Sequence, residues 1–160
     1  MSADQEMPAK LYTTKQMGDA GEMLVAAELT LAGVPALKVA DNWPGYDVVA
    51  QPPDNWPGYG VTTQPSERAP QRISVKSRTK GKMTYVGFDP AKADWLAIVF
   101  IDNSTFPASR QYYIMPMDIS ESYSYSKKTG APRGLYVTTI RKKFTNFEDN
   151  FKLERRAVAE

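Results

Sequence analysis

Three residues of this sequence have types and spacing suited to metal-assisted chemistry: Glu22, Asp47 and Lys76. Asp47 lies where the turn "PGYD" enters the apolar run "VVA", and Lys76 interrupts the strand-like run "ISVKS" on the same face as Ser74. If the two runs pair as strands, the acid and the base meet at a sheet edge, and Glu22 reaches them from a covering helix. Such a cluster can hold a divalent cation and keep a lysine beside an attacking water.

The residue types that are missing narrow the chemistry further. The 160 residues include no histidine and no cysteine. This excludes Ser-His catalysis, histidine bases, thiolate catalysis, disulfides and structural zinc of the usual kind. A metal would therefore be a hard cation held by oxygen, namely magnesium, manganese or calcium.

Length and composition indicate one globular domain. The hydrophobic content is 42%, and a net charge of +2 gives no sign of nucleic acid from the overall charge. No apolar run is long enough to span a membrane, and the first residues lack a signal-peptide pattern. We therefore expect a cytoplasmic protein with no membrane partner, a flexible N-terminal tail at 1–12 and a single domain at 13–160.

Apolar periodicity predicts the elements that position the candidate residues. A helix is expected over 13–33, with Thr13 or Thr14 as its N-cap and Gly33 as its end. Strands are expected at 34–40, 46–50, 71–79, 82–89, 94–102 and 110–119. The strands at 71–79 and 82–89 should form a hairpin, and the strand at 94–102 should lie centrally.

The pattern of apolar residues is less regular in the C-terminal part of the sequence. We expect a loop or short helix over 120–134, a further short strand over 135–144 and a terminal helix over 145–160. The resulting fold class is α+β, α/β/α-like, with a single mixed sheet flanked by an N-terminal and a C-terminal helix.

A tandem repeat lies inside the candidate site. Residues 41–53 and 54–66 match at nine of thirteen positions, but Asp47 of the first copy corresponds to Gly60 of the second. We interpret 41–66 as a duplicated segment within the hairpin that joins Asp47 to Lys76. The first copy should form the strand beside 71–79, because Val48, Val49 and Ala50 are more apolar than Val61, Thr62 and Thr63.

At these residues the sequence resembles the PD-(D/E)XK nuclease superfamily, which has the restriction-endonuclease-like fold seen in Holliday-junction resolvases. In that family a helix with a glutamate precedes a hairpin, an acid opens the first strand, and an acid-X-Lys or Gln-X-Lys triplet lies in the next. Here "GDAGEMLVAAELTLAG" is similar to the helix, "GYD" to the first acid and "ISVKS" to the triplet. The resemblance covers about residues 18–119.

The resemblance implies a Mg²⁺- or Mn²⁺-dependent DNA endonuclease or resolvase-like phosphodiesterase, with a homodimer as one arrangement found among small members. It implies Asp47, Glu22 and Val75 as metal ligands and Lys76 as the residue that positions water. Ser74 departs from the family pattern, because it stands where the family has an acid or glutamine. A neutral serine is a weak magnesium ligand and removes one formal charge from the site.

Other interpretations remain open. Asp47 alone is often a turn residue, Glu22 a solvated helix residue and Lys76 an edge-strand residue. Basic residues near the triplet are expected to bind nucleic-acid phosphates: Arg72, Arg78, Lys80 and Lys82. Besides a nuclease, the sequence is compatible with an inactive nuclease fold that binds DNA or assists assembly, and with a protein-interaction domain without a nucleic-acid role.

Overall fold

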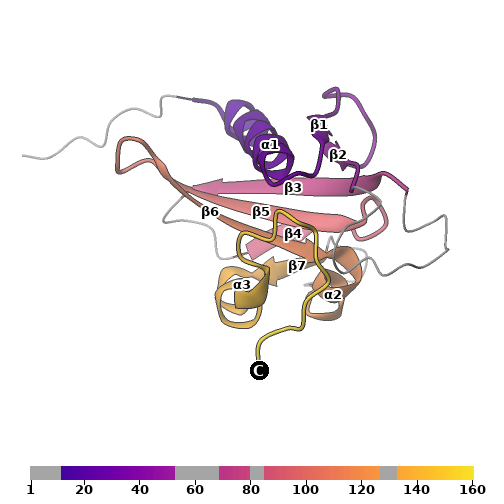
Figure 1. Ribbon diagram of the computed structural model, residues 1–160. Helices are drawn as coiled ribbons and strands as arrows, with labels where there is room; N and C mark the ends of the chain where they lie inside the picture. The colour runs from indigo at the N-terminus through magenta and orange to yellow at the C-terminus, as the bar shows by residue number, and fades with distance from the viewer. Residues whose placement is uncertain (1–11, 53–68, 80–84, 127–132) are drawn as a thin grey trace, which may run out of the picture.

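The computed structural model describes residues 12–52, 69–79, 85–126 and 133–160. A five-stranded mixed sheet separates helix α1 on one face from a two-stranded ribbon and helices α2 and α3 on the other (Figure 1). This confirms the predicted α+β fold with flanking helices. Apart from Tyr12, the predicted tail at 1–12 lies outside the described residues.

The strand order of the main sheet is β1-β2-β3-β5-β6. Its strands are β1 (Ala36–Lys38), β2 (Val48–Ala50), β3 (Gln71–Thr79), β5 (Trp95–Asp102) and β6 (Ser109–Pro116). The β3–β5 pair is parallel, and the other neighbours are antiparallel. Strand β5 lies inside the sheet, as its apolar sequence predicts, and is buried along most of its length.

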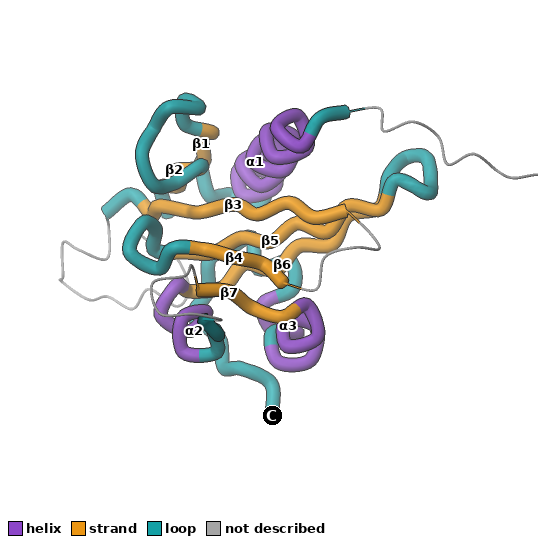
Figure 2. Tube along the Cα trace, turned by 180° about the vertical axis from the view of Figure 1, so that it is seen from behind, coloured by secondary structure: helices purple, strands orange, loops and turns teal. Residues whose placement is uncertain are grey.

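The predicted hairpin between 71–79 and 82–89 is wrong. Strand β4 (Tyr85–Phe88) instead pairs with β7 (Arg133–Tyr136) in the separate ribbon seen in Figure 2. Strand β3 takes β5 as its neighbour over its last seven residues. Strand β5 lies between β3 and β6, where both of its faces are buried. Strand β4 alternates between half-buried and buried residues, so only one of its faces has to pack against the core.

Two apolar cores explain why both faces of the sheet are buried. The first packs Val25 and Leu29 of α1 against residues such as Val48, Ile73 and Val75. The second lies between the other face and the ribbon with α2 and α3; its largest side chains include Leu96, Ile98, Met115, Phe144 and Phe147. Strand β3 contributes Ile73 and Val75 to the first core, while Ser74 on its other face is buried and Lys76 and Arg78 on that face are half-buried.

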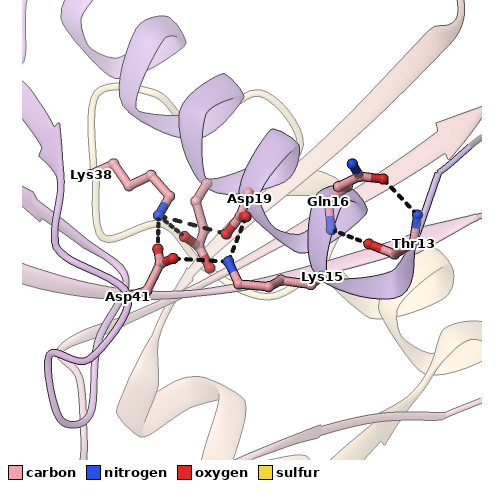
Figure 3. Close-up of polar contacts among 7 residues, drawn as sticks. Thr13, Lys15, Gln16, Asp19, Lys38 and Asp41 are labelled. Atoms are coloured by element: carbon pink, nitrogen blue, oxygen red, sulfur yellow. Dashed lines mark hydrogen bonds and ion pairs between the residues drawn. The ribbon is translucent and has the colours of Figure 1, made fainter.

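Helix α1 (Thr14–Leu31) confirms the first predicted helix. Thr13 caps it: its side chain accepts from the Gln16 backbone N–H, and the Gln16 side chain accepts from the Thr13 backbone N–H (Figure 3). Gly21 faces β3 so closely that a Cβ there would overlap Ser77 Oγ and lie 3.0 Å from Ser77 Cβ. This glycine lets α1 approach β3 next to Glu22.

The predicted helix over 145–160 is wrong. The short helices α2 (Met117–Ser122) and α3 (Val137–Lys143) flank the second core, and only Thr145–Phe147 forms a 3₁₀ turn, labelled η2. Beyond it, Asp149 and Leu153 have positive φ angles of 50° and 54°, which interrupt a right-handed helix. The predicted strand over 135–144 is mostly α3. Across the described stretches, none of the helices has the length and apolar character needed to cross a bilayer.

We predict that Gly21→Ala destabilises the fold although alanine favours helix. The added methyl group meets Ser77, so the free energy of unfolding should fall by about 1–2 kcal/mol. Gly18→Ala in the same helix is the matched control, because a Cβ there meets nothing within 4 Å. It should raise the free energy of unfolding by up to about 1 kcal/mol. Urea unfolding measures both, and equal effects would contradict the close approach.

Candidate functional site

The first copy of the repeat forms the strand beside β3. Val48 lies opposite Ile73 and Ala50 opposite Gln71, so this prediction is confirmed. The second copy, including Gly60, lies outside the described residues. Asp47 therefore stands at the start of the strand that pairs with the "ISVKS" segment.

Asp47 is held at the point where β2 and β3 part. Its backbone N–H donates to the Ile73 carbonyl at 3.0 Å, and its carbonyl accepts from the Val39 N–H at 2.9 Å. Its carboxylate Oδ2 accepts the Val75 backbone N–H at 2.7 Å. The carboxylate thus satisfies a backbone donor of β3 that β2 no longer reaches. Within the described residues, the second oxygen Oδ1 has no hydrogen-bond partner and is free for a ligand.

Asp47 and Glu22 line the same pocket, whose volume is about 250 Å³. One wall is the first half of α1, and the other is the segment that leads from β1 into β2. The lining residues are Lys15, Gly18, Asp19, Glu22, Val39, Ala40, Asp41, Trp43, Tyr46 and Asp47. The structure therefore brings together two of the predicted site residues from opposite sides of one cavity.

A lysine that the sequence analysis missed lies beside this pocket. The Lys38 ammonium lies 3.0 Å from Glu22 Oε2, 2.8 Å from Asp41 Oδ1 and 3.7 Å from Asp19 Oδ1. Lys15 joins the network at 2.8 Å from both Asp19 and Asp41 (Figure 3). The sequence contained one signal for this network. Asp19 and Glu22 are three residues apart, so they share one face of the predicted helix.

The charges of the network shift several pKa values. Burial raises the pKa of Glu22, the hydrogen bond from Lys38 lowers it, and the nearby Asp47 charge raises it again. Hydrogen bonds to Asp41 and Glu22 raise the pKa of Lys38. Hydrogen bonds from Lys15 and Lys38 lower the pKa of Asp41 to about 2. The pKa of Glu22 is thus raised above its ordinary value whereas that of Asp41 is lowered, so Glu22 is the harder of these two carboxyls to ionise.

The predicted triplet on β3 contributes differently. Val75 is buried in the first core, and its backbone binds Asp47. Alternation along the strand places Ser74 and Lys76 on the opposite face, and neither lines the pocket. Ser74 is buried, whereas Lys76 is half-buried and makes no hydrogen bond or ion pair with any described residue. Within the described residues, Val75 is therefore the member of the triplet that forms a hydrogen bond with Asp47.

Two of the predicted phosphate-binding residues are described, and both donate hydrogen bonds within the protein. Arg72 binds both carboxylate oxygens of Asp94, at 2.9 and 3.1 Å. Arg78 donates to the Ser77 carbonyl at 2.8 Å, and burial lowers its pKa. Lys80 and Lys82 lie outside the described residues.

The donor set suits a hard divalent cation although no site is preformed. No three acidic side chains in the described ranges converge as a metal-binding group. Magnesium, however, is usually held by one or two carboxylates together with water and substrate phosphates. Glu22 and Asp47 supply two such carboxylates in one pocket, so the residues present fit Mg²⁺ or Mn²⁺.

A mixed sheet with a covering helix and an acid where two strands part is the arrangement expected for the restriction-endonuclease-like fold. No protein-family model matches the sequence, and no curated protein is a significant match. The structure is similar to the bacterial homing endonuclease I-Ssp6803I, with a TM-score of 0.51, 17% identity and coverage of 79% of this chain and 78% of that one. A Holliday junction resolvase, Hjc of Archaeoglobus fulgidus, matches with a TM-score of 0.40, 17% identity and coverage of 72% and 88%. The chain therefore shares its overall fold with a homing endonuclease, in agreement with the restriction-endonuclease-like fold that the resemblance implied.

We predict that Asp47→Ala destabilises the fold and that Asp47→Asn largely does not. Alanine leaves the Val75 N–H unpaired, which should lower the free energy of unfolding by about 1–3 kcal/mol. Asparagine keeps an acceptor oxygen and loses only the charge. Urea unfolding of both variants measures the difference, and equal stabilities would argue against the hydrogen bond. Asp47→Asn is consequently the variant suited to functional assays.

Proposed function

We propose that the protein is a Mg²⁺- or Mn²⁺-dependent DNA phosphodiesterase, an endonuclease or resolvase-like enzyme. The observation that supports this most directly is the shared pocket of Glu22 and Asp47 where β2 leaves β3. The fold shared with a homing endonuclease makes phosphodiester chemistry at this position a natural hypothesis.

Each candidate site residue has a defined role in this proposal. Asp47 and Glu22 would hold the cation, and the Val75 N–H fixes the orientation of Asp47. A bound divalent cation polarises a phosphoryl oxygen and lowers the pKa of a coordinated water. Lys76, half-buried and without a partner among the described residues, would stabilise the phosphate charge or orient the water. Two of the residues that line the pocket, Trp43 and Asp41, are exposed to solvent.

A second candidate is an inactive nuclease fold that binds DNA. Ser74 favours it, because a buried neutral hydroxyl stands where the family carries an acid. With Lys38 bound to Glu22, the pocket also presents fewer free carboxylates than a strong metal site. Binding of this kind would depend on phosphate contacts and would weaken steeply with salt.

We predict metal-dependent cleavage that Asp47→Asn and Lys76→Met each reduce by about 10²–10⁴-fold. The assay incubates single-stranded, duplex and four-way-junction DNA with Mg²⁺ or Mn²⁺ and follows product formation on denaturing gels. Lys142→Met is the matched lysine control, since Lys142 is exposed on α3 and lies outside the pocket. It should retain wild-type cleavage.

The outcomes separate the candidates. Loss of cleavage in Asp47→Asn and Lys76→Met but not in Lys142→Met supports the enzyme. Intact DNA in every reaction overturns it. Binding by fluorescence anisotropy at about 50 and 200 mM salt then distinguishes a DNA-binding module, whose affinity should fall by orders of magnitude, from a domain that does not bind DNA.

A further inference from the structure

Lys38 occupies a cation position in the acidic half of the candidate site. Its side chain is only 21% exposed, and its ammonium lies within 4 Å of carboxylate oxygens of Asp19, Glu22 and Asp41. It reaches them from β1, opposite α1 (Figure 3). A positive charge thus already sits on one of the two carboxylates that the proposed function assigns to the metal.

Glu22 therefore has two competing partners. It is bound to Lys38 at 3.0 Å, while the like charge of Asp47 across the pocket disfavours its ionised form. A divalent cation shared by Glu22 and Asp47 would remove that repulsion, but the Lys38 ammonium on Glu22 Oε2 would repel it. The two cations therefore compete for the negative charge of Glu22.

Lys38 can release Glu22 without losing all its partners. Asp41 remains at 2.8 Å and Asp19 at 3.7 Å, so the ammonium stays neutralised when one acceptor leaves. The network thus allows Glu22 to exchange Lys38 for a divalent cation.

We propose that Lys38 is an internal cation that competes with the divalent metal for Glu22 and so sets the metal concentration at which the site fills. The proposal rests on the proposed function, because it requires Glu22 and Asp47 to bind a metal. It assigns to Lys38 a positioning role, through Glu22, and no contact with substrate.

The test measures Mn²⁺ binding to the full chain by isothermal titration calorimetry, without DNA. Lys38→Met removes the competing charge and should lower the Kd for Mn²⁺ by at least about fivefold, since a like charge about 4 Å away weakens cation binding by that much even at the dielectric constant of water. Lys38→Arg keeps the charge and should stay within about twofold of wild type. Lys38→Gln gives the same test as Lys38→Met if the methionine variant does not fold.

Lys15→Met is the matched comparison. Lys15 lines the pocket and binds Asp19 and Asp41 as Lys38 does, but among the described residues it forms no ion pair with Glu22, and its side chain is 65% exposed. Solvent screens its charge, so its removal should lower the Kd for Mn²⁺ less than Lys38→Met does. Adding Glu22→Gln to Lys38→Met should abolish the gain in Mn²⁺ affinity, because the side chain at position 22 is then neutral.

The results separate this proposal from the proposed function. A larger gain in Mn²⁺ affinity in Lys38→Met than in Lys15→Met supports the competition, and an equal gain in both variants overturns it. Wild-type binding that Asp47→Asn abolishes but Lys38→Met leaves unchanged or weakens overturns the competition and leaves the metal site standing. Absence of Mn²⁺ binding in both wild type and Lys38→Met overturns the metal site and the competition with it.

Discussion

The hydrogen bond from the Val75 N–H to the Asp47 carboxylate is the contact on which the candidate site depends. It forms where β2 has moved too far from β3 to continue the backbone ladder, so a side chain supplies the missing acceptor. The same bond fixes the direction of the carboxylate and closes the fork between the strands. An acid at this position is therefore part of the sheet as well as part of the pocket.

The candidate site also requires that helix α1 lie close to strand β3. Gly21 brings the helix against Ser77 of β3, and the next residue, Glu22, then faces the pocket from the helix side. Gathering four carboxylates around one small cavity is unfavourable unless cations offset their repulsion. Lys15 and Lys38 supply those cations, and their ion pairs tie α1 to β1 and to the loop that follows it. The close packing at Gly21 and the ion pairs that balance the acids thus involve the same part of α1.

Local signals predicted the parts of the structure that local energetics decide. The capped helix α1, the strand over 71–79 and the first-copy strand all follow from periodicity and burial of nearby residues. The partner of β3 could not be read this way, because its choice between the adjacent β4 and the distant β5 depends on which pairing buries both faces of β5. The helix expected over 145–160 failed for a similar reason: Phe147 and Leu153 are buried in different cores, which an amphipathic helix with one apolar face cannot satisfy. Lys38 was missed because its partners come from α1 and from beyond β1, a relation that spacing alone does not reveal.

The duplicated segment shows how little of the intervening chain the site requires. Asp47 makes its backbone and side-chain hydrogen bonds to Val39, Ile73 and Val75, all outside residues 51–70. Because the entropy of closing a loop grows only slowly with its length, thirteen extra residues between the two strands add little cost. The first copy supplies the β2 strand, because its apolar residues fit against Ile73 and its acid accepts the Val75 N–H. Gly60, the corresponding residue of the second copy, has no side chain with which to make that bond, so the first copy is the one whose sequence suits the position at the fork.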